Sequence, residues 1–344
     1  MPEPSRSISV IISFRNASKY LPACLEAVAA ACRPEDELVL VNDGSRDESE
    51  EIARRFANNL ISLASSHGPA FARNRGAEKA AGRILFFIDA DVLCHSDTLS
   101  RVGEIFAGDA GLAAVIGSYD ANPPEPNFIS RYKNLTHHFV HQNGAAEAST
   151  FWTGCGAVRK EIFFELGGFD EAYGRPCIED IELGYRLRAR GFRIALRRDL
   201  LVTHAKKWTL ASLLRSDILD RAIPWTILQL SYGHILDDLN VSRAQRASSL
   251  LTCAALLLCV CGVFAPFLYA AAAVLMVPVM VWNRRLYHFY LCQGGVAFAL
   301  GAVAMHWFYY CYSIMAFAVG TAAFLCGAGR TACSKLGLAQ RRDG

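Results

Sequence analysis

The feature that most constrains the fold of this 344-residue chain is an apolar run that ends abruptly on two acids. Residues 84–88 are all apolar and mostly β-branched or aromatic, a pattern that predicts a strand buried on both faces of a parallel sheet. Asp89 and Asp91 follow at once, at the strand end where open α/β sheets bind their ligands. Because Mg²⁺ is usually held by one or two protein carboxylates together with substrate phosphates, the pair predicts a cation that carries a phosphorylated ligand. A surface turn bearing two acids is the alternative.

Strand-like and helix-like segments alternate around this run. Strands are predicted at 8–14, 37–41, 60–64 and 83–88, and helices between them at 20–31, 48–57 and from 69 to about 82. Such alternation predicts a doubly wound, mostly parallel α/β sheet. The carboxyl ends of its strands would bring Asn16, Asp43 and the acid pair to one edge.

Each polar residue near this edge suggests a chemical role. Asp43 is suited to accept hydrogen bonds from a base or a ribose, although an aspartate in such a stretch is more often a turn or cap residue. Asp91 would hold a cation against a diphosphate. Arg73, near a helix N-terminus, would contact a phosphate with help from the helix dipole. The chain has neither a GxGxxG motif nor a Walker lysine motif, which argues against a dinucleotide fold or a P-loop.

Four segments, 9–16, 41–45, 68–76 and 89–91, stand in the order found in family 2 glycosyltransferases. The chain resembles this GT-A-type family, whose members use nucleotide sugars, over about two thirds of its length. The resemblance implies that Asp43 contacts the nucleobase, and that the pair of Asp89 and Asp91 binds Mg²⁺ or Mn²⁺ and the donor diphosphate. Asn42 departs from the family, which often has a second aspartate at this position.

A second chemical focus is the acidic start of a predicted helix that ends near Gly191, where Glu179 and Asp180 stand side by side. Acids at a helix start also interact favourably with the helix dipole, so the pair needs no chemical role. The resemblance implies that Asp180 is the general base that deprotonates an acceptor hydroxyl opposite the leaving diphosphate, with inversion at the anomeric carbon. Glu179 would orient that base or contact the acceptor.

Two residues further along extend the hypothesis. In similar enzymes a histidine near the position of His204 completes the metal or diphosphate shell, although a lone histidine is more often structural. Arg221 lies where processive members carry a QxxRW motif, and we expect it to grip the diphosphate. The glutamine of that motif is absent and Pro224 intervenes, which argues against a processive polymerase. His137 and His141, four residues apart, lack a third metal ligand, so a metal pair there carries little weight.

Composition divides the chain into a polar and an apolar part. The chain is 53% hydrophobic, and charged residues nearly vanish between Arg246 and Arg330. The predicted regions are a cytoplasmic catalytic domain at 1–246, a membrane region at 247–330 and a polar tail at 331–344. The N-terminus shows no apolar signal-peptide region, and the 12 cysteines show no disulfide or metal spacing. We therefore expect the catalytic domain to stay in the cytoplasm.

We expect three membrane-spanning helices, or four. Residues 247–282 are long enough for two closely turned spans of ~17–18 residues, with the turn at Pro266. Arg284 and Arg285 then return the chain to the cytoplasmic side by the positive-inside rule. Residues 294–326 supply a third span, or two if the aromatic cluster at 306–310 marks an interface.

Taken with these patterns, the resemblance implies an inner-membrane, metal-dependent, inverting glycosyltransferase with a GT-A-like α/β catalytic domain and an all-α transmembrane region. The expected cofactor is Mg²⁺ or Mn²⁺, the donor a UDP-, GDP- or dTDP-sugar, and the acceptor a lipid or lipid-linked hydroxyl. A net charge of only +3, without a dense Lys/Arg block, argues against nucleic acid. A sugar-nucleotide nucleotidyltransferase, which would release pyrophosphate, and a catalytically inactive membrane scaffold are the alternatives.

Overall fold

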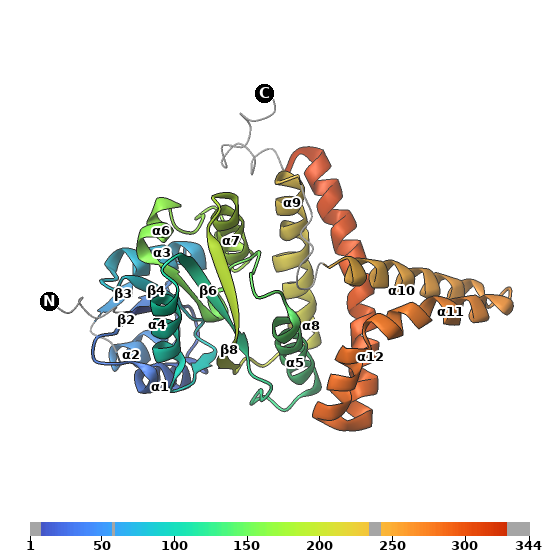
Figure 1. The fold of residues 1–344 in the computed structure, drawn as a ribbon, viewed down its shortest axis with the longest axis horizontal. Coiled ribbons are helices and arrows are strands. Elements are labelled where there is room, and N and C mark those ends of the chain that lie inside the picture. Colours follow the sequence, from blue (N-terminus) through green and yellow to red (C-terminus); the bar gives the residue numbers. More distant parts are fainter. Residues whose placement is uncertain (1–7, 57–58, 234–241, 329–344) are drawn as a thin grey trace. The chain divides into compact units, whose positions relative to one another are not determined.

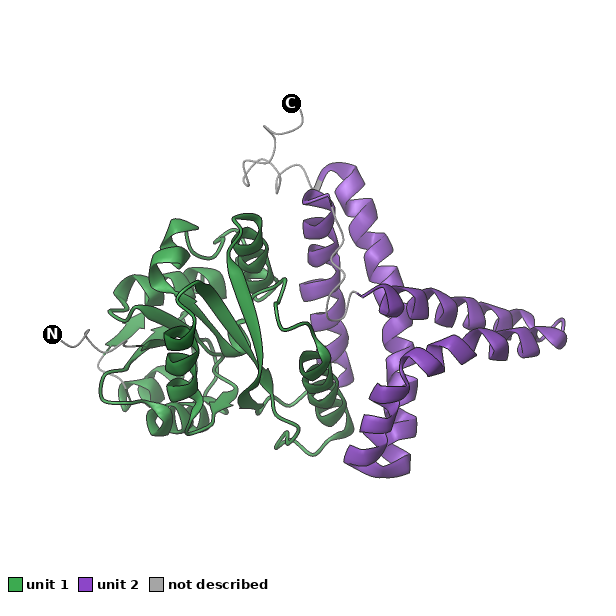
Figure 2. Ribbon diagram, in the orientation of Figure 1, with its two compact units in different colours: residues 1–208 green, residues 209–344 purple. Residues whose placement is uncertain are grey.

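The computed structural model describes residues 8–56, 59–233 and 242–328, and it divides into two compact units. The first unit covers residues 1–208 and the second covers residues 209–344 (Figure 2). The sequence analysis placed the end of the catalytic domain at residue 246. In the structure the helices after residue 208 group with the apolar helices, because they share buried contacts with the long C-terminal helix.

One mixed sheet forms the centre of the first unit (Figure 1). In the described residues its eight strands have the order β3-β2-β1-β4-β7-β6-β8-β5. Their bounds are β1 Ile8–Phe14, β2 Glu37–Asn42, β3 Asn59–Ser62, β4 Ile84–Phe87, β5 Val92–Cys94, β6 Leu112–Tyr119, β7 Gly156–Arg159 and β8 Arg193–His204. Strand β4 is wholly buried, as its unbroken apolar run predicted, while β1 is buried except for Ser13 and β2 is buried from Val39 onward.

The two halves of the sheet differ in direction. Strands β3, β2, β1 and β4 are all parallel, as predicted for the first half of the chain. Strand β7 runs antiparallel to both β4 and β6, β8 runs parallel to β6, and β5 runs antiparallel to β8. The prediction of an α/β fold of the GT-A kind is therefore confirmed, with a mixed rather than a uniformly parallel second half.

Helices flank this sheet, and their bounds are α1 Leu21–Ala31, α2 Ser49–Arg54, α3 Pro69–Lys79, α4 Thr98–Gly108, α5 Phe128–Asn143, α6 Lys160–Glu165 and α7 Glu179–Ala189. Helix α3 packs closely on the sheet, because a Cβ at Gly76 would lie 2.7 Å from Ile11 Cγ2 and 3.1 Å from Val41 Cγ2. Helix α7 ends just before Gly191, which has φ +80°, in agreement with the predicted glycine cap.

An aromatic cluster fixes the segments around α6 and α7 to the sheet. Phe87 at the end of β4 lies 5.0 Å from Phe169, 5.4 Å from Phe163 and 6.4 Å from Phe151 between ring centroids. A Cβ at Gly184 on α7 would lie 2.2 Å from the backbone nitrogen of Phe151. Glycine at this position therefore lets α7 approach the chain before β7 closely.

The second unit is helical throughout its described residues, with α8 Leu210–Leu214, the π-helical segment η2 Arg215–Ala222, α9 Ile223–Ser231, α10 Arg243–Cys261, α11 Phe267–Trp282, α12 Arg284–Ala323 and the π-helical segment η4 Phe324–Ala328. The predicted turn is confirmed, because Pro266 precedes α11. Helix α12 is interrupted at Gly295, where φ is +73°, but continues through residues 306–310. The number of membrane spans stays a prediction.

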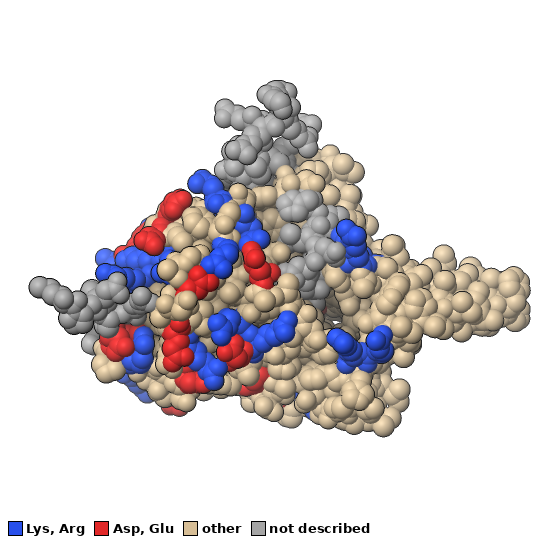
Figure 3. Space-filling model, in the orientation of Figure 1, with Lys and Arg blue, Asp and Glu red and all other residues tan. Residues whose placement is uncertain are grey.

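Two segments of the second unit, Arg243–Cys261 and Arg284–Gly327, are long and apolar enough to cross a membrane, while α11 is shorter. Large apolar side chains are exposed along α10 and α11, and Phe264 at their turn is 90% exposed. Figure 3 shows this pair of helices without Lys, Arg, Asp or Glu along most of its length, whereas charged side chains cover the face of the first unit. Exposed apolar area of this extent is typical of a surface that faces lipid or another protein.

Candidate active site

The loop that joins β3 to α3 is anchored by the buried carboxylate of Asp43, which follows β2 directly. Oδ1 of Asp43 accepts a hydrogen bond from the backbone N–H of His67 at 2.7 Å. Its Oδ2 accepts from Ser66 Oγ at 2.7 Å and from the N–H of Gly68 at 3.0 Å. Gly68 has φ +98°, and a Cβ there would lie 2.6 Å from the carbonyl oxygen of Gly174, so this position requires glycine. Asp43 fixes the loop, and its contact with a nucleobase stays a prediction.

Asn16 orders the neighbouring loop, which follows β1. It has φ +49°, a conformation that asparagine adopts more readily than most residues. Its Oδ1 accepts a hydrogen bond from the N–H of Arg46 at 2.8 Å, and its own N–H donates to Ser45 Oγ at 3.1 Å. Since β1 and β2 are parallel neighbours, the loops after them meet at one edge, as predicted. Asn42, the departure from the family pattern, donates to Glu50 on α2 at 2.8 Å.

The acid pair follows β4 in a turn that is held from three sides. The N–H of Ile88 donates to the carbonyl oxygen of Ile11 at 3.3 Å, and the N–H of Val92 donates to the carbonyl oxygen of Asp89 at 3.0 Å. The thiol of Cys24 donates to the same Asp89 oxygen at 3.6 Å, and burial raises the pKa of this thiol. These hydrogen bonds hold the backbone of the turn, while its two carboxylates stay partly exposed.

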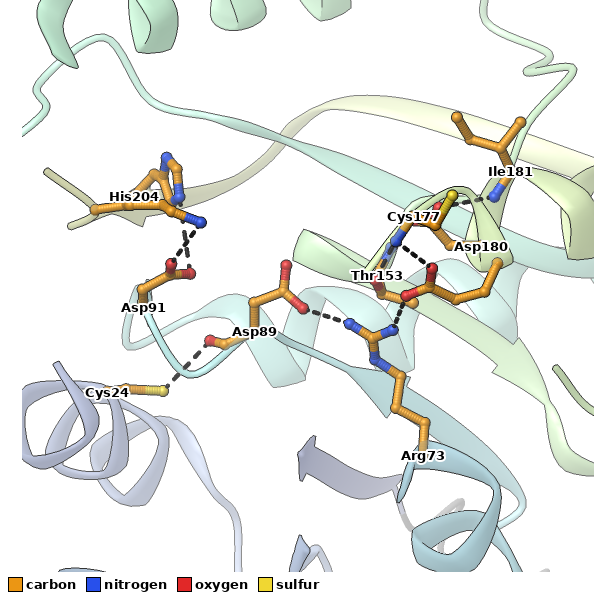
Figure 4. A network of polar contacts seen from close by, with 11 residues as sticks. Cys24, Arg73, Asp89, Asp91, Thr153, Cys177, Asp180, Ile181 and His204 are labelled. Atoms are coloured by element: carbon orange, nitrogen blue, oxygen red, sulfur yellow. Dashed lines mark hydrogen bonds and ion pairs between the residues drawn. The ribbon is translucent and has the colours of Figure 1, made fainter. Parts of the chain in front are cut away.

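A buried arginine links this turn to the start of α7 (Figure 4). The side chain of Arg73 on α3 is only 7% exposed. Its Nη2 donates to Asp89 Oδ1 at 2.7 Å and its Nη1 donates to Glu179 Oε1 at 2.6 Å. Charge-assisted hydrogen bonds of this length are among the strong ones in proteins. Three segments that are far apart in the sequence are thereby joined at one point.

Burial and these two partners set the charge of Arg73. Burial works against the charged guanidinium, but the carboxylates of Asp89 and Glu179 outweigh it and raise the Arg73 pKa. Burial raises the pKa of Glu179, and Arg73 opposes that rise. Glu179 Oε2 also accepts a hydrogen bond from the N–H of Cys177 at 3.0 Å. Both terminal nitrogens of Arg73 thus bind carboxylates, and its contact with a phosphate stays a prediction.

Asp180 lies beside this network and is held by Thr153 (Figure 4). Its Oδ2 accepts hydrogen bonds from the N–H of Thr153 at 3.1 Å and from Thr153 Oγ1 at 3.2 Å, and its Oδ1 accepts from the N–H of Ile181 at 2.8 Å. Thr153 begins the short 3₁₀ turn η1, Thr153–Cys155, which leads into β7. The sequence analysis missed Thr153, since the two partners are 27 residues apart.

The other acid of the pair, Asp91, faces two groups at the end of β8. His204 Nε2 lies 3.7 Å from Asp91 Oδ1, and Lys206 Nζ lies 3.8 Å from Asp91 Oδ2. The antiparallel pairing of β5 with β8 explains this proximity, because Val92 pairs with His204. The sequence analysis did not assign Lys206 to the site. Its ammonium also lies 4.6 Å from the ring centroid of Trp208.

The donor groups around Asp91 fit Mg²⁺ or Mn²⁺. Distances of 3.7 and 3.8 Å are too long for direct hydrogen bonds, so the carboxylate keeps lone pairs for a cation. Carboxylate oxygens suit both ions, and an imidazole nitrogen is a common metal ligand. Among the described residues no three His, Cys, Asp or Glu side chains form a complete metal site. A cation held by Asp91 and His204 would therefore take further ligands from water and from donor phosphates.

The remaining residues of the sequence hypothesis lie elsewhere. Arg221 lies in η2 of the second unit, and its contact with a diphosphate stays a prediction. His141 Nδ1 faces the carbonyl oxygen of Gly117 at 3.0 Å, and the rings of His137 and His141 lie with centroids 4.1 Å apart and planes tilted by 40°. The two histidines thus pack with aromatic neighbours on the inner face of α5.

Comparison with known proteins adds an independent line of support. Residues 9–167 match the model of the glycosyl transferase family 2, which confirms the resemblance drawn from the four motifs. The match ends before α7 begins at residue 179, so it does not include Glu179 and Asp180.

Curated relatives share part of the chain. Validoxylamine A glucosyltransferase of Streptomyces hygroscopicus subsp. limoneus is 29% identical over 226 residues, which cover 56% of this chain and 50% of that protein. The PGL/p-HBAD biosynthesis glycosyltransferase of Mycobacterium tuberculosis is 43% identical over 100 residues, 27% of this chain and 39% of that protein. The chain thus spans about half the length of the curated relatives it matches, or less.

Among solved structures, the mannosyltransferase PcManGT of Pyrobaculum calidifontis, in complex with GDP-Man and Mn²⁺, is similar with a TM-score of 0.51. The two proteins are 19% identical, and the likeness covers 92% of this chain and 86% of that chain. At this identity the comparison establishes the fold alone.

Proposed function

We propose that this protein, whose residues 9–167 match the model of the glycosyl transferase family 2, is an inverting, metal-dependent glycosyltransferase that acts at a membrane. The observation that carries the proposal is the double ion pair of Arg73 with Asp89 and Glu179. This pair ties the acid turn after β4, where a donor diphosphate would bind, to the acidic start of α7, where an acceptor would bind.

The donor side consists of strand ends and the groups around Asp91. The loops of Asn16 and Asp43 would receive the nucleoside, since they lie at the carboxyl ends of parallel strands. Asp91 and His204 would hold Mg²⁺ or Mn²⁺, and Lys206 would contact the diphosphate. When bound, the cation neutralises negative charge that develops on the leaving diphosphate. The mannosyltransferase of similar fold forms a complex with GDP-Man and Mn²⁺, which is in line with a nucleotide-sugar donor and a divalent cation here.

The acceptor side is the start of α7. Asp180 would take the proton from the acceptor hydroxyl as that oxygen attacks the anomeric carbon opposite the diphosphate. Thr153 holds one oxygen of Asp180 with two hydrogen bonds, which keeps the carboxylate in one orientation. Glu179, which is held by Arg73, would orient Asp180 or contact the acceptor.

The second unit makes a lipid or lipid-linked acceptor the most economical proposal. Two of its segments meet the length and composition of a membrane span, and apolar side chains on α10 and α11 face outward. We propose that these helices anchor the protein in the inner membrane with the catalytic unit on the cytoplasmic side. An acceptor embedded in the same membrane would then reach the site by lateral diffusion.

The experiment is a donor screen with the full-length protein in nanodiscs. UDP-, GDP- and dTDP-sugars are offered with Mn²⁺ or Mg²⁺ and a lipid extract, and released nucleoside diphosphate is measured. We expect release with one donor class, its loss in excess EDTA and in Asp91→Ala, and an inverted anomeric configuration by NMR.

Other outcomes decide against the proposal. Release of pyrophosphate would identify a nucleotidyltransferase, and absence of donor binding in every condition would favour an inactive scaffold. Full activity in excess EDTA would remove the metal from the mechanism, and a retained anomeric configuration would exclude Asp180 as the base of a single displacement.

A further inference from the structure

The imidazole of His204 is held by an amide on a different element. Nδ1 of His204 lies 2.7 Å from Oδ1 of Asn134, on α5, and both side chains are buried. The ring of Tyr119 stacks on a face of the imidazole, with centroids 4.4 Å apart and planes only 3° from parallel. The imidazole plane and its rotation are therefore both fixed by neighbours.

The helix that carries Asn134 is itself fixed to the sheet. His138 Nδ1 lies 2.6 Å from the carbonyl oxygen of Tyr119, and His141 Nδ1 lies 3.0 Å from that of Gly117, both on β6. Asn134, His138 and His141 have spacings of four and three residues, so they share one face of α5. This face docks on the end of β6, next to the end of β8 where His204 lies.

The first turn of α5 also holds the segment that follows His204. Ser130 Oγ accepts a hydrogen bond from the N–H of Trp208 at 2.7 Å, and Asn127 Nδ2 donates to the carbonyl oxygen of Trp208 at 2.9 Å. Asn127 is also the N-cap of the helix, since its Oδ1 accepts from the N–H of Ser130 at 2.9 Å. Helix α5 and its N-cap therefore contact both ends of the segment 204–208, namely His204 and Trp208.

The Asn134 contact decides which imidazole nitrogen carries the proton. The Asn134 oxygen can only accept, so Nδ1 of His204 donates to it, and in the neutral imidazole Nε2 then keeps its lone pair. Nε2 is the nitrogen that faces Asp91, at 3.7 Å. Metal-binding histidines almost always donate their other N–H to a carboxylate or a carbonyl oxygen, which fixes their tautomer and orientation.

We propose that Asn134 is a positioning residue that presents Nε2 of His204 to a divalent cation shared with Asp91. This inference rests on the proposed function, because it concerns the cation site of that function. The Nδ2 of Asn134 makes no hydrogen bond within the described residues, although it is buried. A buried donor without a partner destabilises the fold, and an apolar residue at this position would avoid that cost.

The test measures Mn²⁺ affinity of the full-length protein in detergent, by EPR titration without donor. The variants are Asn134→Leu, which removes the acceptor at similar volume, Asn134→Asp, which keeps it, and His204→Ala. Asn143→Leu, at the exposed C-terminal end of the same helix, is the matched control. Loss of an outer-shell partner typically costs ~10–100-fold in metal affinity, which we expect for Asn134→Leu and, at least as large, for His204→Ala. Asn134→Asp and Asn143→Leu should bind Mn²⁺ nearly as the wild type does.

The outcomes separate this inference from the proposed function. If His204→Ala weakens Mn²⁺ binding while Asn134→Leu does not, the inference is wrong and the cation site stands. If Asn134→Asp loses as much affinity as Asn134→Leu, the role of Asn134 is structural and the inference is also wrong. If the wild type binds no Mn²⁺, or His204→Ala binds it unchanged, the inference falls together with this cation site, although donor turnover in the separate screen would still support a glycosyltransferase. Thermal unfolding without metal shows whether each variant is folded.

Discussion

Replacing Arg73 with methionine tests the junction between the two halves of the site. Methionine keeps much of the side-chain length but removes the charge that both carboxylates face. Glu179 is 5% exposed and would be left buried without its partner, whereas Asp89 is 35% exposed and can be solvated. Breaking a buried ion pair costs about 3–5 kcal/mol, and the more exposed partner adds roughly 0–1 kcal/mol. In a unit of about 200 residues, a loss of 3–5 kcal/mol lowers Tm by roughly 6–20 °C.

The stability lost in Arg73→Met should depend on pH, because protonation removes the unpaired buried charge of Glu179. Burial already raises the pKa of Glu179 above its ordinary value of 4.5, and the Arg73→Met substitution removes the cation that opposes this rise. A carboxyl whose pKa is raised in the folded state loses stability as pH rises from its unfolded pKa through its folded pKa. The difference between variant and wild type should therefore be largest at pH 8 and shrink as the pH falls towards 4.5.

The assay is thermal unfolding of wild type, Arg73→Met, Glu179→Gln and the double variant at pH 8 and pH 5. The double variant should regain much of the stability at pH 8, since Gln carries no charge to bury. Arg75→Met is the control, because Arg75 on the same helix pairs with the exposed acids Glu78 and Glu171. Equal losses in Arg73→Met and Arg75→Met, or no recovery in the double variant, would refute the account of a buried pair.

Three further tests address the base, the donor loop and the membrane. Asp180→Asn should leave donor binding nearly intact in titrations while kcat falls ~10²–10⁴-fold; a parallel loss of donor affinity would contradict its role as base. Ala at Gly68 should lower donor affinity because its Cβ meets backbone, whereas Ala at Gly167 (also positive φ, but with open space) should not, as measured by donor-induced thermal shift. Leu257→Arg on the exposed face of α10 should reduce recovery of the chain with membranes after carbonate washing, and unchanged recovery would argue against lipid contact there.

Local sequence patterns predicted those parts of the fold that depend on local burial. Strand β4 is a continuous apolar run and β1 and β2 are mostly apolar, while helix α1 buries the regularly spaced Leu21, Leu25 and Val28. Strand β5 has only three residues, and its partner in β8 lies more than 100 residues later, so no nearby pattern marks it. The direction of β7 also depends on the path of the chain between β6 and β7 rather than on its own residues.

The site shows the same division between local and distant information. The acids were found because they end strands or begin a helix, but their partners lie far away in the sequence. Arg73 was assigned to a phosphate because it is near the N-terminus of α3, whereas its charge is used by Glu179, 106 residues away. One local signal was available, since the side of α3 that packs on the sheet is otherwise made of small residues such as Ala72 and Gly76. A buried arginine on such a face requires acids from another element.

The negative charges at the site outnumber the positive ones, so Arg73 alone does not neutralise them. Asp89, Asp91, Glu179 and Asp180 contribute four carboxylates, while Arg73 and Lys206 contribute two cationic groups. When all are ionised, the site carries an excess of two negative charges with His204 neutral. Arg73 compensates the buried acid of α7, but its place between Asp89 and Glu179 gives Asp91 no hydrogen bond from it. A divalent cation at Asp91 would balance the excess, so that a diphosphate would meet a site of zero net charge, Lys206 included, rather than a repulsive one. Donor binding should therefore follow cation binding, and the two affinities should rise together by linkage.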